Sequence, residues 1–157
     1  MGPAGKIVIH CDGACSGNQF RSNVGGWGAV LKYNSDTKEI SGGELNTSNQ
    51  RMEITACIRA LEKLKSTVHP VEIYTDSAYL ANCMHKKWYA RWRQNGWKNA
   101  NRQPVENRDL WERLLELLAP LKVTFFKVEG HSGNALNERA DELARAAIEK
   151  LRKAARY

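Results

Sequence analysis

The alternation of apolar and polar positions first becomes clear in residues 6–12, where it predicts a β-strand in the middle of a sheet. Apolar side chains fall on both faces of this segment, as expected for a strand that is covered on two sides. We expect Asp12 to end the strand and Gly13 to turn the backbone away. Open α/β sheets place ligands at such strand ends, although Asp12 taken alone is better explained by an Asx turn.

Further along the chain the same patterns predict four more strands and a series of helices. The expected strands after the first span residues 25–33, 38–44, 71–75 and 123–128. Four helices are expected. The first opens at Thr47–Gln50 with capping-box spacing, and the second runs from Ser77 to about Met84. The third starts at the candidate N-cap Asn107, and the fourth starts near Asn137. The first three strands suggest an antiparallel meander, and the helix before residues 71–75 makes parallel addition plausible. This order predicts one mixed sheet with helices on its faces, in an α/β or α+β arrangement.

The glycines on either side of Trp27 weaken the second strand as a β-former. A glycine in a strand often marks a place where another backbone comes close. We therefore expect a close approach of another element at this strand.

Four acidic residues lie near an element end and near a buried face: Asp12, Glu53, Asp76 and Asp141. Each has a simpler explanation when taken alone. Glu53, expected in the first helical turn, could serve the helix dipole, and Asp76 could cap the next helix. If the strands are parallel, however, Asp12 and Asp76 emerge at the same edge. Converging carboxylates need a neutralising cation, and all-oxygen ligands favour Mg²⁺ or Mn²⁺ over zinc.

Residues 86–102 are the most distinctive segment by composition, because they combine cations and tryptophans and contain no acid. The residues concerned are Lys86, Lys87, Trp88, Arg91, Trp92, Arg93, Trp97, Lys98 and Arg102. One alternative is a helix whose tryptophans pack into the core while its charges face water. Three tryptophans within ten residues, among unopposed cations, better suit a protruding element that binds phosphates and the faces of sugars or bases.

Length and charge narrow the classes of protein further. The chain has 157 residues, which favours a single domain over residues 1–157, and its formal charge of +7 favours a polyanionic partner. The four cysteines lack paired C-x-x-C spacing, so we expect free thiols in a cytoplasmic protein. No apolar run is long enough to span a bilayer, so no membrane partner is expected. His131 is isolated in an expected loop, and a lone histidine is weak evidence for a functional site.

Several of these motifs, in this order, resemble ribonuclease H type 1, and in particular the bacterial members that carry a basic protrusion. They are Asp12-Gly13, Ser48-Asn-Gln-Arg-Met-Glu53, Thr75-Asp-Ser77, the basic stretch ending Gly96-Trp-Lys98, and Gly130-His-Ser-Gly133 with Asn137–Ala144. The resemblance covers nearly the whole chain. It implies a ribonuclease H-like fold, with a five-stranded mixed sheet flanked by helices. It also implies hydrolysis of the RNA strand of RNA–DNA hybrids, leaving 5′-phosphate and 3′-hydroxyl ends.

The resemblance assigns roles to individual residues. Asp12, Glu53, Asp76 and Asp141 match four catalytic carboxylates that hold two Mg²⁺ ions, and His131 matches a loop histidine that assists proton transfer or product departure. The matches for substrate binding are Asn18, Asn49 and Gln50 at the minor groove, Trp88 and Trp92 at the DNA strand, and Ser48 and Asn107 at a DNA phosphate. Asn46 stands where some relatives have an arginine in that phosphate pocket.

The resemblance also implies an RNA–DNA hybrid as partner and a monomer as the working form. Two other classes remain open from the residues themselves. The chain could be a hybrid-binding module without activity, or a DNA-processing relative of the integrases and resolvases. The intact acid set argues against the first, and the basic stretch with Asn49 and Gln50 argues against the second.

Overall fold

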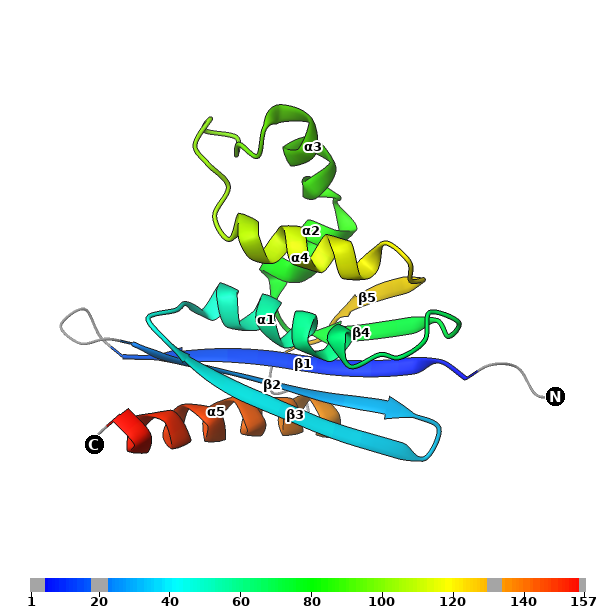
Figure 1. The fold of residues 1–157 in the computed structure, drawn as a ribbon, viewed down its shortest axis with the longest axis vertical. Helices are drawn as coiled ribbons and strands as arrows, with labels where there is room; N and C mark the ends of the chain where they lie inside the picture. The colour runs from blue at the N-terminus through cyan, green and yellow to red at the C-terminus, as the bar shows by residue number, and fades with distance from the viewer. Residues whose placement is uncertain (1–4, 18–22, 130–133, 156–157) are drawn as a thin grey trace.

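The computed structural model describes residues 5–17, 23–129 and 134–155, which form a five-stranded sheet with helices on both faces (Figure 1). The strand order is β3-β2-β1-β4-β5. The strands are β1 (Ile7–Ser16), β2 (Val24–Tyr33), β3 (Asp36–Leu45), β4 (Val71–Thr75) and β5 (Val123–Lys127). The helices are α1 (Asn49–Glu62), α2 (Ala78–His85), α3 (Trp88–Asn95), α4 (Arg108–Leu118) and α5 (Ala135–Ala155). The predicted mixed sheet flanked by helices is confirmed.

The central strand β1 has a different partner on each side. It pairs antiparallel with β2 along its whole length, from Ile7 opposite Tyr33 to Ser16 opposite Val24. Its parallel pairing with β4 covers only the first four positions and stops at His10. The two strands therefore separate just before Asp12. The expected parallel addition of residues 71–75 is confirmed, and β5 pairs with β4 in parallel as well.

The prediction that Asp12 ends its strand is wrong, because β1 continues to Ser16. Pairing with β2 persists after β4 has left, so the strand does not need to turn at Gly13. The glycine has another function: a Cβ there would lie 2.4 Å from the backbone nitrogen of Glu53. Gly13 therefore lets α1 lie directly against β1, next to Asp12.

The helices divide between the two faces of the sheet. Helices α1, α2 and α4 lie on one face, and α5 lies across β1, β2 and β3 on the other (Figure 1). The core between α1, α4 and the sheet contains fully buried side chains such as Ile9, Ile54, Ile73, Trp111 and Leu114. Helix α3, which lies within the basic stretch and carries Arg91 and Arg93, extends away from the sheet (Figure 1). The four cysteines are free thiols, as expected.

Two helix starts differ from the prediction because side chains decide which residue caps. Ser48, and not Thr47, caps α1, and its Oγ accepts from the Arg51 backbone nitrogen at 3.1 Å. Glu53 is the fifth residue of α1, so it lies beyond the first turn and does not serve the helix dipole there. At α5, the side chain of Asn134 accepts from the Asn137 backbone nitrogen at 3.1 Å, so the helix starts at Ala135.

Two other predicted caps need correction. Ser77 caps α2 by accepting from the Leu80 backbone nitrogen at 3.1 Å, which leaves Asp76 free of that role. Asn107 occupies the N-cap position of α4 with a φ of 63°, but its side chain makes no cap hydrogen bond.

Among the helices within the described ranges, none is both long enough and apolar enough to cross a bilayer.

The close approach expected at the glycines of β2 is confirmed, and the approaching element is α5. A Cβ on Gly26 would lie 2.1 Å from the Ala144 carbonyl oxygen, and a Cβ on Gly28 would lie 2.5 Å from that of Ala140. Any larger residue would push α5 away from the sheet. Since Asp141 is on α5, these glycines also set the position of a predicted site residue.

We expect Gly26→Ala to lower the free energy of unfolding by about 1–3 kcal/mol, as overpacking of a core does. Gly96→Asn is the control, because a Cβ at Gly96 meets no atom within 4 Å and asparagine tolerates its φ of 79°. Urea denaturation of both variants would measure the difference. Equal stability of Gly26→Ala and wild type would contradict the close contact with α5.

Candidate functional site

The structure brings three of the four predicted acids into one cluster at the point where β1 and β4 separate. Asp12 lies on β1, Glu53 on α1, and Asp76 directly after β4. One carboxylate oxygen from each lies within 4.8 Å of the others. Asp12 is buried, with 5% of its surface exposed, and its Oδ1 accepts from the Gly13 backbone nitrogen at 2.9 Å. The expected convergence of Asp12 and Asp76 is therefore present.

Burial and mutual repulsion make these carboxylates hard to ionise together. Burial, followed by the charges of Asp76 and Asp141, raises the pKa of Asp12 to about 7. Burial, followed by the charges of Asp12 and Asp76, raises the pKa of Glu53 well above its ordinary value. The cluster is thus a place where a cation would be strongly favoured.

The donor set fits a hard divalent cation. All ligands on offer are carboxylate oxygens, the chemistry that Mg²⁺ and Mn²⁺ prefer. In addition, Glu53 Oε2 is buried and has no hydrogen-bond partner within the described part of the chain. A buried, unpartnered carboxylate oxygen is costly unless something binds it.

Asp141 approaches the cluster from the other face of the sheet. It lines the same small hollow of about 30 Å³ as Asp12 and Asp76, together with Glu129, Asn134, Asn137 and Glu138. Its carboxylate accepts a hydrogen bond from Arg145, one turn further along α5. Asp141 is not within the 4.8 Å group of the other three acids, so it forms the outer wall of the site.

Asn137 is a site residue that the sequence patterns did not single out. Its side chain is 6% exposed, and its Oδ1 lies 3.1 Å from Nδ1 of the buried His10. Burial lowers the pKa of His10, and the bond to Asn137 opposes this effect in part. The only local signal was spacing, since Asn137 stands one helical turn before Asp141.

Most of the predicted basic residues share one surface around α3, which we call the basic surface. It surrounds a hollow of about 850 Å³, and its lining includes Lys86, Lys87, Trp88, Arg91, Trp92 and Lys98. The cations are exposed and the two tryptophans are half-buried. Trp88 and Trp92 are neighbours across one helical turn, with ring centroids 6.3 Å apart and planes tilted by 51°. The expected shared face of these two tryptophans is confirmed.

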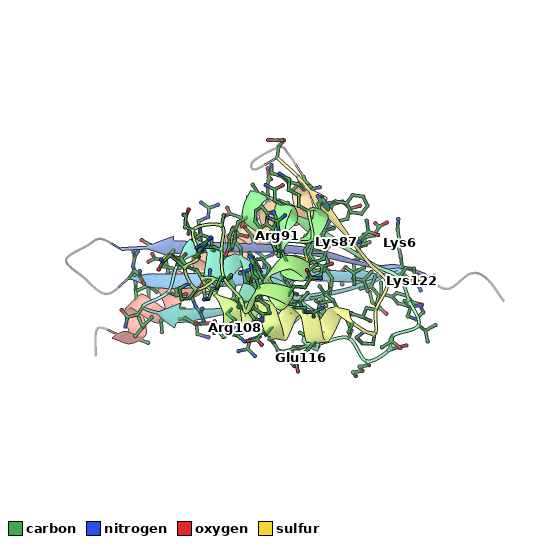
Figure 2. The ribbon with its side chains drawn as sticks, turned by 90° about the horizontal axis from the view of Figure 1, so that it is seen from above. Lys6, Lys87, Arg91, Arg108, Glu116 and Lys122 are labelled. Carbon is green, nitrogen blue, oxygen red and sulfur yellow. The ribbon has the colours of Figure 1, made fainter. Side chains whose placement is uncertain are left out.

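The structure separates two predicted residues from the basic surface. Arg93 lies over the ring of Tyr89, and with Trp97 it lines a second hollow against α4. Trp97 is 8% exposed and packs between Trp92 and Arg108. In Figure 2, Arg108 lies on the α4 side, apart from the labelled Arg91 of the basic surface. Trp97 therefore supports the protrusion from within.

A third group joins the start of α1 to the start of α4. Arg51 donates to both carboxylate oxygens of Asp109, at 3.0 and 2.8 Å, and to Asn107 Oδ1 at 3.3 Å. Because Ser48 caps the Arg51 nitrogen, Arg51 links the two residues predicted to form a phosphate pocket, Ser48 and Asn107. No sequence pattern indicated this link, since Arg51 and Asp109 are 58 positions apart.

The remaining predicted residues differ in how they are placed. Asn49 and Gln50 are in the first turn of α1, the helix that carries Glu53, and both are exposed. Asn46 has a φ of 54°, and its backbone nitrogen donates to the Asn23 carbonyl at 3.0 Å. Asn18 and His131 lie outside the described residues.

Known proteins resemble this chain along most of its length. The family described as RNase H matches residues 4–149. Among curated relatives, Ribonuclease H of Moorella thermoacetica is 53% identical over 94% of this chain and 95% of its own length. Ribonuclease H of Chlorobaculum parvum is 55% identical over 90% of this chain and 94% of its own.

Solved structures show the same arrangement of elements. LC9-RNase H1, a type 1 RNase H with the type 2 active-site motif, is 30% identical, with a TM-score of 0.82 over 94% of this chain and 74% of that one. LC11-RNase H1, solved in complex with an RNA/DNA hybrid, is 24% identical, with a TM-score of 0.71 over 93% and 99%. At that identity the second likeness is one of fold.

The raised pKa of Asp12 predicts how stability depends on pH without metal. Between the ordinary pKa of 3.8 and the folded value of about 7, the folded chain binds more protons than the unfolded chain. The free energy of unfolding should therefore fall as pH rises from about 4 to 7, and then level off. Asp12→Asn should be more stable than wild type at pH 7.5, by about 2–4 kcal/mol.

Urea denaturation in EDTA at several pH values between 4.5 and 7.5 would measure both effects. Glu106→Gln, an exposed acid outside the cluster, controls for the change in net charge. If wild type and Asp12→Asn showed the same pH profile, the carboxylates would not repel one another as described.

Proposed function

Because the chain belongs to the RNase H family, whose members are divalent-metal-dependent nucleases, we propose that it hydrolyses the RNA strand of RNA–DNA hybrids. The observation that carries this proposal is the pairing of two features in one molecule. A buried carboxylate cluster that fits divalent cations lies on the same chain as an exposed basic surface with aromatic side chains. The first suits phosphodiester hydrolysis, and the second suits a nucleic acid substrate.

Asp12, Glu53, Asp76 and Asp141 would hold two Mg²⁺ ions through their carboxylate oxygens. When bound, these ions would activate the attacking water and stabilise the leaving 3′-oxygen, which gives 5′-phosphate and 3′-hydroxyl ends. Asp12, Glu53 and Asp76 reach the cluster from separate elements, so the fold fixes their spacing before metal arrives. Asp141 would complete the site after exchanging its contact with Arg145. Mn²⁺ is a substitute that the same oxygen ligands accept.

Choice of the RNA strand would depend on α1. Asn49 and Gln50 are in its first turn, and Glu53 is one turn from them. Their amides can donate to and accept from a 2′-hydroxyl in the wide minor groove of an A-like duplex. The groups that would read the RNA strand thus share a helix with one of the acids that would hold the metal.

The DNA strand would lie on the basic surface and on the link between α1 and α4. Trp88 and Trp92 offer ring surface to it, and the cations beside them offer contacts to phosphates. Ser48 and Asn107 would hold one DNA phosphate, with Arg51 as the nearby cation in a pocket where Asn46 supplies none. The roles of Asn18 and His131, action as a monomer and a cytoplasmic location stay predictions from the family.

A cleavage assay tests the proposal directly. End-labelled RNA–DNA hybrid, double-stranded DNA and double-stranded RNA would be incubated with Mg²⁺ or with EDTA. We expect cutting of the RNA in the hybrid alone, and only with metal. Asp12→Asn should lose activity by at least about 10³-fold, because it removes the charge of a buried metal ligand, while it still binds the hybrid.

Binding without any cutting by wild type would identify a hybrid-binding module. Cutting of double-stranded DNA would instead identify a DNA-processing enzyme. Either result would contradict the proposed function.

The basic surface gives a separate prediction about salt. Replacing Lys86, Lys87, Arg91 and Lys98 by Ala should raise KM and flatten its salt dependence. The slope of log KM against log salt concentration should change by about 0.9 for each phosphate that is no longer neutralised, if the hybrid behaves as B-form DNA. The value of kcat should change much less, since these cations bind the ground and transition states alike. Steady-state kinetics at several salt concentrations would measure this.

The control replaces four exposed cations elsewhere, Lys38, Lys63, Lys65 and Lys122, and so makes the same change in net charge. Equal effects in both quadruple variants would show that overall charge, and not the basic surface, attracts the substrate.

A further inference from the structure

We propose that His10 is a positioning residue for RNA cleavage, acting through the side-chain amide of Asn137. In this proposal His10 holds the amide so that its amino group faces the hollow between the acids. There it donates a hydrogen bond to an oxygen of the phosphodiester being cut. The proposal rests on the proposed function and adds two residues to it.

The contact joins the two elements that form opposite walls of the site. His10 Nδ1 and Asn137 Oδ1 are 3.1 Å apart, both side chains are buried, and 127 positions separate them in sequence. On β1, His10 is two residues before Asp12, so both side chains point to the same face of the sheet. On α5, Asn137 is one turn before Asp141 and shares its face.

The chemistry of the amide follows from this bond. An asparagine side chain has an oxygen that accepts and an amino group that donates twice. With its oxygen bonded to His10, Asn137 has its amino group left for the hollow that it lines. The other residues around this hollow are five acids and Asn134. Carboxylates repel the oxygens of a phosphodiester, so an uncharged donor among them favours entry of the phosphate in one orientation.

The orientation of the imidazole is itself fixed by aromatic neighbours. His10 stacks on Tyr74, with ring centroids 4.7 Å apart and planes 9° apart. Tyr74 stacks in turn on Phe126, at 4.9 Å and 15°. The three residues are neighbours in the register of β1, β4 and β5. Stacking restrains the plane of the ring, and the hydrogen bond to Asn137 selects the orientation in which Nδ1 faces the amide.

Three substitutions separate the hydrogen bond from the stacking. His10→Phe keeps an aromatic ring on Tyr74 and removes the bond. His10→Asn keeps a polar atom near the position of Nδ1, whereas His10→Gln places its amide near Nε2. On the hybrid, kcat should fall by about 10- to 100-fold in His10→Phe and His10→Gln, with KM within about twofold. His10→Asn should remain within about threefold of wild type.

A double-mutant cycle tests whether the two residues act together. Asn137→Ala should reduce kcat as His10→Phe does, and the double variant should be no worse than either by more than about threefold. His69→Phe is the matched control, because it replaces a histidine that packs on Tyr33 away from the acids, and it should leave kcat unchanged. Calorimetry should give the same Mg²⁺ affinity for His10→Phe as for wild type, since every carboxylate is retained.

Four outcomes would overturn the positioning role. Two concern kcat of the single variants: a normal value in both His10→Phe and His10→Gln, or a loss in His10→Asn as large as in His10→Phe. The other two are a kcat of the double variant reduced by the product of the two single losses, and weakened Mg²⁺ binding in His10→Phe. Thermal unfolding of each variant, measured in the same buffer, confirms that folded protein is compared. These outcomes differ from failure of the proposed function, in which wild type itself would leave the RNA of the hybrid intact.

Discussion

The repulsion among buried carboxylates is the constraint on which the rest of this structure depends. Three acids within 4.8 Å of one another are tolerable only if rigid elements hold them and a cation can neutralise them. The fold supplies the rigidity by bringing β1, α1 and β4 together where two strands separate. Small residues then become necessary around the cluster. Gly13 admits α1, and the glycines of β2 admit α5, so backbone spacing sets the geometry of the site.

The elements could largely be predicted from sequence because their signals are local. Alternation of apolar positions identified the five strands, and the acids stood out by their place near buried faces. Asp12 was misplaced at a strand end because the change of partner along β1 depends on where β4 leaves, which no local pattern records. The links Arg51–Asp109 and His10–Asn137 were also missed, since their members are 58 and 127 positions apart. Such pairs exist only once the chain is folded.

In the proposed function, the cations of the basic surface and the acids of the cluster lie on different parts of the molecule. The acids lie between packed elements, whereas α3 extends from the body on α2 (Figure 1), and its cations are exposed. Trp97 and Arg93 stabilise that extension from the α4 side and leave Lys87 and Arg91 to face outward (Figure 2). A change on the extension can therefore alter affinity with little effect on the spacing of the carboxylates.

The packing of the tryptophans has an optical consequence. Trp92 lies within about 6 Å of Trp97 and Trp111 and 6.3 Å from Trp88, measured between ring centroids. Indole rings this close exchange excitation energy, so we expect the four to contribute jointly to fluorescence and near-ultraviolet circular dichroism. Two of them border the hollow of the basic surface, while the other two connect it to α4. The protein thus carries a built-in fluorescent reporter of what occupies that surface, with no label attached.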